Sequence, residues 1–277
     1  MIKNKNSYEF INSSGGLATG MNSIHSKNDT IWIGWPGIAS DNLNKKTKGE
    51  LNKFLDKKNF KPVHLNKKEI KDFYYGLSNK SLWPLFHYFI EYSIFDKDNW
   101  DSYKSVNNKF AQCIIENYNE GDLIWIHDYQ LMLCPKIVRD LIPNSIIGFF
   151  LHIPFPSFEI FRIFPWRKEL LSGILGSDLV GFHTYNYQRH FLSSVKRILL
   201  KNVKLNRVSV GSRKILVNTF PMGIDFEKFN NGAKKYLTKN SLKKPQFSLK
   251  NILTIDRLDY TKGVVQRIKA FEMFLDN

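Results

Sequence analysis

Ser145-Ile146-Ile147-Gly148-Phe149-Phe150-Leu151 decides the fold, because after its first residue the stretch has no polar side chain. Continuous rather than alternating hydrophobicity is typical of a strand buried on both faces of a parallel sheet. Four shorter runs repeat the pattern, and stretches with helical periodicity follow several of them. The runs cover residues 122–126, 178–182, 214–218 and 251–255, and the helical stretches cover 106–118, 187–200 and 264–275. This alternation predicts an α/β protein with a parallel sheet, helices on both faces and right-handed crossovers.

The composition favours a folded protein without a membrane segment. The chain has 277 residues, 43% of them hydrophobic, and no apolar run approaches the ~20 residues that a membrane helix needs. The polar N-terminal residues show no secretory leader. The two cysteines, Cys113 and Cys134, fit neither a disulfide scaffold nor a zinc ribbon. We therefore expect a cytoplasmic protein with no membrane partner.

The chain is strongly basic, with 41 Lys and Arg against 25 Asp and Glu and a net charge of +16. Such a charge could serve nucleic-acid binding through phosphate contacts. The lysines, however, lie in short patches among Asn and Asp, as at 45–48, 57–58 and 67–68, without interleaved aromatic residues. We interpret them as solvated surface and expect no nucleic-acid partner. A basic nucleic-acid-binding protein is the remote alternative.

Residues 230–250 divide the chain by composition. They are rich in Asn, Lys and Ser, which is typical of a linker, whereas 251–277 hold one apolar run, a polar loop and one helical stretch. A single strand and helix cannot bury both faces of the strand. We predict a Rossmann-like domain over 1–229, a linker over 230–250 and the start of a second domain over 251–277.

Polar side chains follow four of the predicted strands. They are His127 and Asp128, then His152, then His183, and finally Arg257 and Lys262 within the loop 256–263. In open parallel α/β sheets, ligands bind beyond the carboxyl ends of the strands. Four such ends, which carry His, Asp, Arg and Lys, predict a binding site beyond the strands.

Two features of the N-terminal part also fit a ligand site, each with a simpler alternative. In Ser13-Ser14-Gly15-Gly16-Leu17, paired glycines would let backbone N–H groups approach a phosphate, although an ordinary turn has the same composition. Trp35 and Trp83 lie beside prolines, where indole faces suit stacking on sugar rings. Buried core tryptophans would show the same pattern.

As a set, these segments resemble the trehalose-6-phosphate synthase family, glycosyltransferase family 20, whose members have two Rossmann domains (GT-B type). The motifs occur in the family's order and span nearly the whole chain. They are Ser14–Leu17, Gly34-Trp35, Tyr74 before Trp83–Tyr88, Trp125–Tyr129, Gly148–Pro156, Gly181–Thr184, Phe220–Asp225 and Arg257–Gly263. The resemblance implies the N-terminal half of a GT-B fold, followed by the first strand and helix of an incomplete second Rossmann domain.

The resemblance also implies a reaction. Glucose would pass from UDP-glucose to the anomeric hydroxyl of glucose 6-phosphate with retention of configuration, without a metal or other cofactor. A front-face displacement, in which the donor phosphate takes the acceptor's proton, needs no pair of catalytic carboxylates.

The family's motifs assign roles to individual residues. Arg257 and Lys262 would hold the donor diphosphate, Gly15 and Gly16 would contact UDP-glucose, and His152 would bind hydroxyls of the transferred glucose. Trp35, Tyr74, Trp83 and Asp128 would form the acceptor pocket, and Trp83 and Ile153 would select the anomer. Asp128, His152, Arg257 and Lys262 are the implied catalytic residues.

The chain departs from the family pattern at both ends. It lacks the family's Asn-Arg-Leu-Pro strand before Tyr8, and the Asp-Gly-Met-Asn-Leu segment that holds uridine does not follow Lys262. Gln130 and Met222 are smaller departures. We expect a gene fragment or one piece of a split enzyme, with little or no synthase activity alone. The alternative is a non-catalytic regulatory subunit that pairs with a full-length synthase or a phosphatase.

Overall fold

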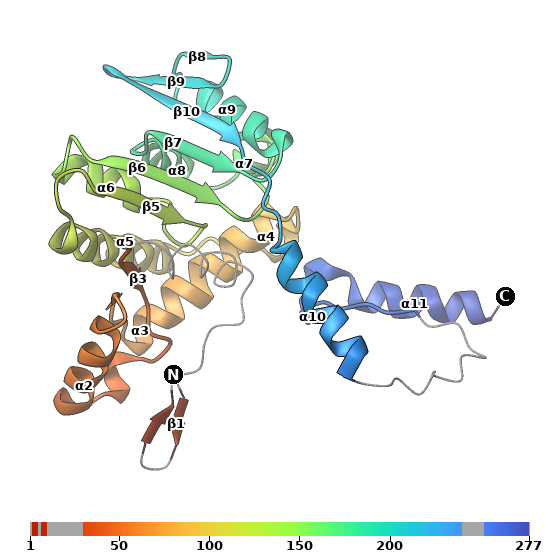
Figure 1. The fold of residues 1–277 in the computed structure, drawn as a ribbon. Helices are drawn as coiled ribbons and strands as arrows, with labels where there is room; N and C mark the ends of the chain where they lie inside the picture. The colour runs from red at the N-terminus through yellow and green to blue at the C-terminus, as the bar shows by residue number, and fades with distance from the viewer. Residues whose placement is uncertain (1, 5–6, 10–29, 240–251, 277) are drawn as a thin grey trace. The chain divides into compact units, whose positions relative to one another are not determined.

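The computed structural model describes residues 2–4, 7–9, 30–239 and 252–276. Four parallel strands form the centre: β5 (Leu123–His127), β6 (Ile146–Leu151), β7 (Leu179–Phe182) and β10 (Arg213–Thr219). β9 (Arg207–Val210) and β8 (Val203–Lys204) extend the sheet as an antiparallel hairpin. The order across the sheet is β5-β6-β7-β10-β9-β8 (Figure 1). With helices on both sides, this sheet confirms the predicted α/β class.

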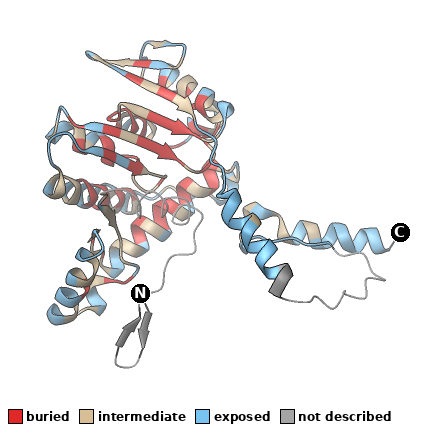
Figure 2. Cartoon of the chain, viewed as in Figure 1, coloured by how far each residue is buried: buried red, intermediate tan, exposed pale blue. Residues whose placement is uncertain are grey.

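The strand register explains why the apolar runs are continuous. Ile126, Phe149, Val180 and Val217 lie opposite one another across the four parallel strands. None of the four side chains is more than 3% exposed. Burial is concentrated in these strands and in the helices packed on them (Figure 2).

One helix precedes the strands of this sheet, and four more lie between them along the chain. They are α5 (Lys97–Asn117), α6 (Cys134–Leu141), α7 (Phe158–Phe161), α8 (Arg167–Ile174) and α9 (Tyr185–Ile198). α5 begins earlier than the predicted residue 106, because the Asp96 carboxylate accepts the N–H of Asn99 at 2.9 Å and caps its first turn. Trp100 of α5 stacks on Trp166, with ring centroids 4.9 Å apart, and joins α5 to the start of α8.

The residues before α5 form short elements. The strands are β1 (Ile2–Asn4) and β2 (Ser7–Glu9), which pair with each other, and β3 (Trp32–Gly34) and β4 (Phe60–Pro62), which form a parallel pair. The helical segments are η1 (Ser40–Asn42), α2 (Lys45–Asp56), α3 (Lys67–Glu69), η2 (Ile70–Leu82), α4 (Trp83–Phe86) and η3 (Ile90–Tyr92). η2 is π-helical, and at its end the N–H of Trp83 donates to the carbonyl of Ser78. Such wide turns often occur beside functional sites.

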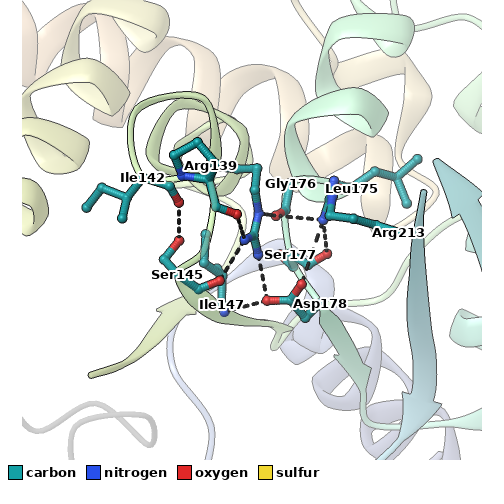
Figure 3. A network of polar contacts seen from close by, with 10 residues as sticks. Arg139, Ile142, Ser145, Ile147, Leu175, Gly176, Ser177, Asp178 and Arg213 are labelled. Atoms are coloured by element: carbon teal, nitrogen blue, oxygen red, sulfur yellow. Dashed lines mark hydrogen bonds and ion pairs between the residues drawn. The ribbon is translucent and has the colours of Figure 1, made fainter. Parts of the chain in front are cut away.

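Arg139 of α6 ties together backbone segments at the end of the sheet where the parallel strands begin (Figure 3). Its Nε donates to the carbonyl of Gly176 at 3.0 Å, and its Nη1 donates to the carbonyls of Pro143 and Ser145 at 2.7 and 2.6 Å. Its Nη2 lies 2.6 Å from a carboxylate oxygen of Asp178. One guanidinium thus binds carbonyls in the segments that follow α6 and α8.

Asp178 and Arg213 complete this network. Asp178 accepts the N–H of Ile147 at 2.8 Å, at the start of β6. Arg213, from the start of β10, donates to the carbonyls of Leu175 and Ser177 at 2.8 and 3.1 Å. The network joins the beginnings of β6, β7 and β10, at the opposite end of the strands from the predicted binding edge.

The chain divides into two compact units, Met1–Met222 and Gly223–Asn277. The second holds α10 (Phe226–Lys239), η4 (Tyr260–Lys262) and α11 (Val264–Leu275). α10 covers the first ten residues of the predicted linker, and 240–250 lie outside the described residues. The domain boundaries at 229 and 250 stay predictions.

The prediction of a strand over 251–255 is wrong for the described residues of that range. Residues 252–255 form no strand, and Ile252, Leu253 and Ile255 are each more than 70% exposed. The physical reason is that no described strand of this unit lies beside them, so their backbone groups have no sheet partner. The helix expected over 264–275 is confirmed as α11.

In the described part of the chain, no helix is both long enough and apolar enough to cross a lipid bilayer.

Candidate active site

The carboxyl ends of β5, β6 and β7 bring three imidazoles together. His127 ends β5, and His152 and His183 follow directly after β6 and β7. His127 Nδ1 lies 3.0 Å from His152 Nε2. The ring centroids of His152 and His183 are 5.4 Å apart. The side chain of Phe150 packs against both rings, at centroid distances of 4.6 and 5.0 Å.

These histidines are neutral at physiological pH. Burial lowers the pKa of His127 to about 4. Burial, with the neighbouring His127 and His183, lowers the pKa of His152 to about 3, and burial also lowers the pKa of His183. Of the two nitrogens that face each other between His127 and His152, one must donate and the other must accept. The pair therefore holds His152 in one ring orientation and one tautomer.

We expect acidification to break this pair and to destabilise the first unit. The pKa values of both rings lie below the ordinary value of about 6.5, so the unfolded chain binds protons that the folded chain excludes. Their contribution to stability is complete above pH 6.5 and is lost as the pH falls towards 4 and then 3. Nitrogen NMR of labelled imidazoles should show both rings neutral at pH 5, with opposite protonation of the facing nitrogens.

His190 serves as the internal control for that measurement, because its Nδ1 lies 3.1 Å from the carbonyl of Phe155 and must carry a proton. Titration of His127 or His152 near pH 6.5 would contradict the predicted pairing.

Asp128 bends the chain away from β5 and towards β6. Its φ is 72°, in the left-handed region that few residues other than glycine adopt. Its N–H donates to the carbonyl of Phe150 at 2.8 Å, and its carboxylate accepts the N–H of His152 at 3.1 Å. Backbone strain of this kind is often retained at functional sites. The carboxylate thus holds the backbone of His152.

The carboxyl group of Asp128 titrates in an unusual range. Burial raises its pKa to about 6, and the N–H groups of Tyr129 and His152 act in the opposite direction. At pH 7 the group is mainly ionised and accepts hydrogen bonds. It is therefore suited to receive hydroxyl groups of a ligand at the sheet edge.

Two pairs of aromatic residues hold the tryptophans singled out above. Trp35 packs against Tyr74 of η2 with ring centroids 5.9 Å apart, and its Nε1 donates to the carbonyl of Ile38 at 3.1 Å. Trp83 packs against Tyr129, the residue after Asp128, at 5.7 Å. Trp83 therefore lies beside the turn that positions Asp128.

The remaining predicted site residues lie elsewhere. Ile153 is 5% exposed and belongs to the hydrophobic core. Arg257 and Lys262 belong to the second unit, where both are exposed. Lys262 ends η4, whose first turn is capped by the Asp259 carboxylate accepting the N–H of Thr261 at 2.9 Å. Gly15 and Gly16 lie outside the described residues.

His127 and His183, the partners of His152, lie within the family motifs, but the resemblance assigned no role to either of them. The sequence carried a signal for both, since each stands at a strand end, but their distances from His152 could not be read from it. No group of three His, Cys, Asp or Glu side chains among the described residues is arranged to hold a metal ion.

The fold and this edge define a class: an open parallel α/β sheet with polar side chains gathered beyond its carboxyl ends. The sequence profile of glycosyltransferase family 20 matches residues 2–277. The chain belongs to this family.

Individual relatives agree with this assignment. The chain is 45% identical over 282 residues to the alpha,alpha-trehalose-phosphate synthase [UDP-forming] of Pichia angusta, covering 98% of this chain and 58% of the relative. An alpha,alpha-trehalose-phosphate synthase (UDP-forming) from Burkholderia xenovorans, solved with glucose-6-phosphate, aligns with a TM-score of 0.81 and 28% identity over 95% of this chain and 59% of that one. The N-terminal domain of Candida albicans trehalose-6-phosphate phosphatase aligns with a TM-score of 0.83 and 34% identity, over 97% and 58%.

The chain spans only part of the curated relatives that it matches. It covers 38% of the bifunctional synthase/phosphatase of Thermoproteus tenax and 58% of the Pichia angusta synthase.

Proposed function

We propose that this chain is the acceptor-side part of a retaining glycosyltransferase of the cytoplasm, which moves glucose from UDP-glucose to glucose 6-phosphate. The products would be trehalose 6-phosphate and UDP. The observation that supports this most directly is the joint placement of Asp128 and His152 beyond β5 and β6, linked by a 3.1 Å hydrogen bond. The names of the matched relatives support the same reaction.

In this proposal the acceptor sugar lies against Asp128. The ionised carboxylate accepts its hydroxyl groups, and Trp83 forms a wall beside the turn that holds that carboxylate. Trp35 and Tyr74 form a second wall, because their flat aromatic faces suit the apolar face of a sugar ring. Ile153, buried in the core and next to His152 in the sequence, acts on anomer choice through packing, together with Trp83.

The donor glucose lies beside His152. A neutral imidazole can donate to or accept from sugar hydroxyls without carrying charge into the site. Arg257 and Lys262 supply cations for the diphosphate, a guanidinium fork and an ammonium point charge, which stabilise the charge that develops on the leaving UDP. Gly15 and Gly16 supply backbone N–H groups to the donor. No metal or other cofactor takes part in the proposed reaction.

Retention follows from attack on the face that the leaving group departs from. The bond between the anomeric carbon and the donor phosphate oxygen breaks, and the acceptor oxygen bonds to the same face. The departing phosphate oxygen takes the acceptor's proton. Asp128 and His152 orient the two sugars and need not become nucleophile or general base.

Binding of glucose 6-phosphate to the full chain tests the acceptor site. We expect saturable binding in calorimetry, and Asp128→Asn should weaken it by about 10- to 100-fold, because a hydrogen bond to a charged group contributes about 1.5–3 kcal/mol. Asparagine tolerates the left-handed backbone at this position, so the variant should stay folded. UDP release from UDP-glucose should fall with the same substitution wherever turnover is measurable.

Asp140→Asn is the matched control, since Asp140 forms only an exposed ion pair with Lys136 at 2.7 Å. Absence of saturable binding, or equal affinity of Asp128→Asn and the native chain, would refute the proposed acceptor site.

A second candidate is a non-catalytic partner of a synthase or phosphatase. It is favoured by one observation, the 0.83 TM-score to the N-terminal domain of a trehalose-6-phosphate phosphatase. Copurification with a longer family member would distinguish the two. The non-catalytic role is supported if synthase activity rises only in the mixture and survives Asp128→Asn in this chain. A loss of activity in that mixture would instead support the catalytic role.

A further inference from the structure

The positive charge of the chain is unevenly distributed along the sequence. Residues 179–224 contain no Asp or Glu but eight Lys and Arg, which equals half of the net charge of +16. The eight are Arg189, Lys196, Arg197, Lys201, Lys204, Arg207, Arg213 and Lys214. A stretch of this kind differs from the mixed Lys and Asn patches elsewhere, because the stretch itself contains no carboxylate.

The structure gathers three of these cations around a hollow beside α9. The cavity measures about 920 Å³ and lies between α9 and the β8–β9 hairpin. Arg189, Lys196 and Arg197 line it from one side of α9, as their spacing of seven and eight residues requires. None of its lining residues is acidic. Its volume falls in the range of about 300–1,000 Å³ that small-molecule sites occupy.

The floor and walls of the hollow combine apolar and hydrogen-bonding groups. Leu192 and Val203 provide apolar surface, and Asn206 provides an amide from the hairpin. Gln188 is fixed, because its amide donates to the carbonyl of Val217 at 3.0 Å and accepts the hydroxyl of Thr219 at 2.7 Å. The walls are thus held in place while the charged ends of the α9 side chains reach solvent.

The cations at the rim have little intramolecular compensation. Among the described residues, neither Arg189 nor Lys196 makes an ion pair or a side-chain hydrogen bond. Arg197 contacts Glu159 at 3.3 Å, but both side chains are more than half exposed, so the pair contributes little. The dipole of α9 favours Lys196 and Arg197 in its last turn. It does not account for Arg189 in the middle of the helix.

A second, smaller hollow continues the same charge. It measures about 380 Å³ and shares Arg197 with the first. Arg162, Arg167 and Lys168 line it, again without an acidic residue. Six different Lys and Arg side chains therefore line two adjoining hollows.

We propose that the hollow between α9 and the β8–β9 hairpin binds an organic phosphate of the size of a sugar phosphate or a mononucleotide. Arg189 and Arg197 offer guanidinium forks that match phosphate oxygens, and Lys196 adds a point charge. Leu192 and Val203 receive the apolar part of the ligand. The site shares no lining residue with the candidate active site, and it begins at Tyr185, two residues after His183.

Calorimetry on the full chain with three probes tests this site: inorganic phosphate, glucose 6-phosphate and AMP. We expect one of the organic phosphates to bind more tightly than inorganic phosphate, and R189Q/K196Q to weaken that binding at least tenfold. K201Q/K204Q removes the same charge from the same acid-free stretch outside the hollow. It should change the affinity less than twofold, and both double variants should keep the native unfolding midpoint.

Further arms separate this site from other sources of binding. Asp128→Asn should leave unchanged the binding event that R189Q/K196Q weakens, which distinguishes the hollow from the proposed acceptor pocket. Equal losses in the two double variants would show diffuse electrostatics and overturn the proposal. Absence of saturable binding of any organic phosphate would also overturn it. So would a single-stranded RNA that binds more tightly than the organic phosphates and loses affinity equally in the two double variants.

Discussion

Gly176→Ala is expected to prevent stable folding of the first unit. A Cβ atom at this position would lie 2.3 Å from the backbone nitrogen of Lys136 and 2.4 Å from its Cα. These are backbone atoms of α6, so no side-chain rotation can relieve the overlap. The segment after α8 would have to move away from α6, and the Arg139 bond to the Gly176 carbonyl would be lost with it.

We expect a destabilisation of about 4 kcal/mol or more, which is a large share of the roughly 5–15 kcal/mol that stabilises a typical domain. Urea unfolding followed by tryptophan fluorescence measures it, provided that soluble protein is obtained. If the variant is too unstable for that measurement, we expect a sharp loss of soluble protein on expression.

Gly49→Ala is the matched control. Gly49 lies within α2, and a Cβ atom there would meet no atom within 4 Å. Alanine should stabilise this helix by about 0.5–1 kcal/mol, because glycine loses more conformational entropy on folding. Equal unfolding midpoints for the two variants would contradict the close approach of α6 and the segment after α8.

The contrast between these two glycines shows what the sequence could predict and what it could not. The parallel strands were predictable because burial on both faces leaves a continuous apolar run, as at 146–151. No local sequence pattern shows that Gly176 must be glycine, since the backbone that it approaches lies forty residues earlier. The β8–β9 hairpin was missed because its strands are short and polar, and 252–255 were overpredicted because an apolar run does not show whether a partner strand is present.

The candidate site was predictable to the same extent. The rule that ligands bind beyond the carboxyl ends of parallel strands placed His127, Asp128, His152 and His183 at one edge before any coordinates were known. It could not give the His127–His152 hydrogen bond or the left-handed backbone of Asp128, because both depend on how neighbouring strands are staggered. Nothing in the sequence distinguishes Arg139 and Asp178, near the other end of the strands, from ordinary surface charges.

Arg139→Met should destabilise the first unit by about 2–4 kcal/mol, because it removes a donor from carbonyl groups that stay in place. The Arg139 side chain is only 10% exposed. Its loss leaves three carbonyl groups and one carboxylate oxygen of Asp178 without this donor (Figure 3). Arg139→Lys should cost less but still destabilise, since an ammonium cannot reach partners in several directions at once. Arg162→Met is the control, because its contact with Glu159 at 3.4 Å is exposed and should contribute less than about 0.5 kcal/mol.

The double variant Arg139→Met with Asp178→Asn separates the two parts of this effect. If the loss comes mainly from the uncompensated carboxylate, neutralising Asp178 should restore a large part of the stability, which a double-mutant cycle measures in urea. If it comes mainly from the carbonyl groups, the double variant should be no more stable than Arg139→Met, because those groups lack the Arg139 donor in both. We expect the second outcome to dominate, since Arg213 lies 3.8 Å from the other carboxylate oxygen of Asp178 and still offsets its charge. An Arg139→Met variant as stable as Arg162→Met would contradict both accounts and the network itself.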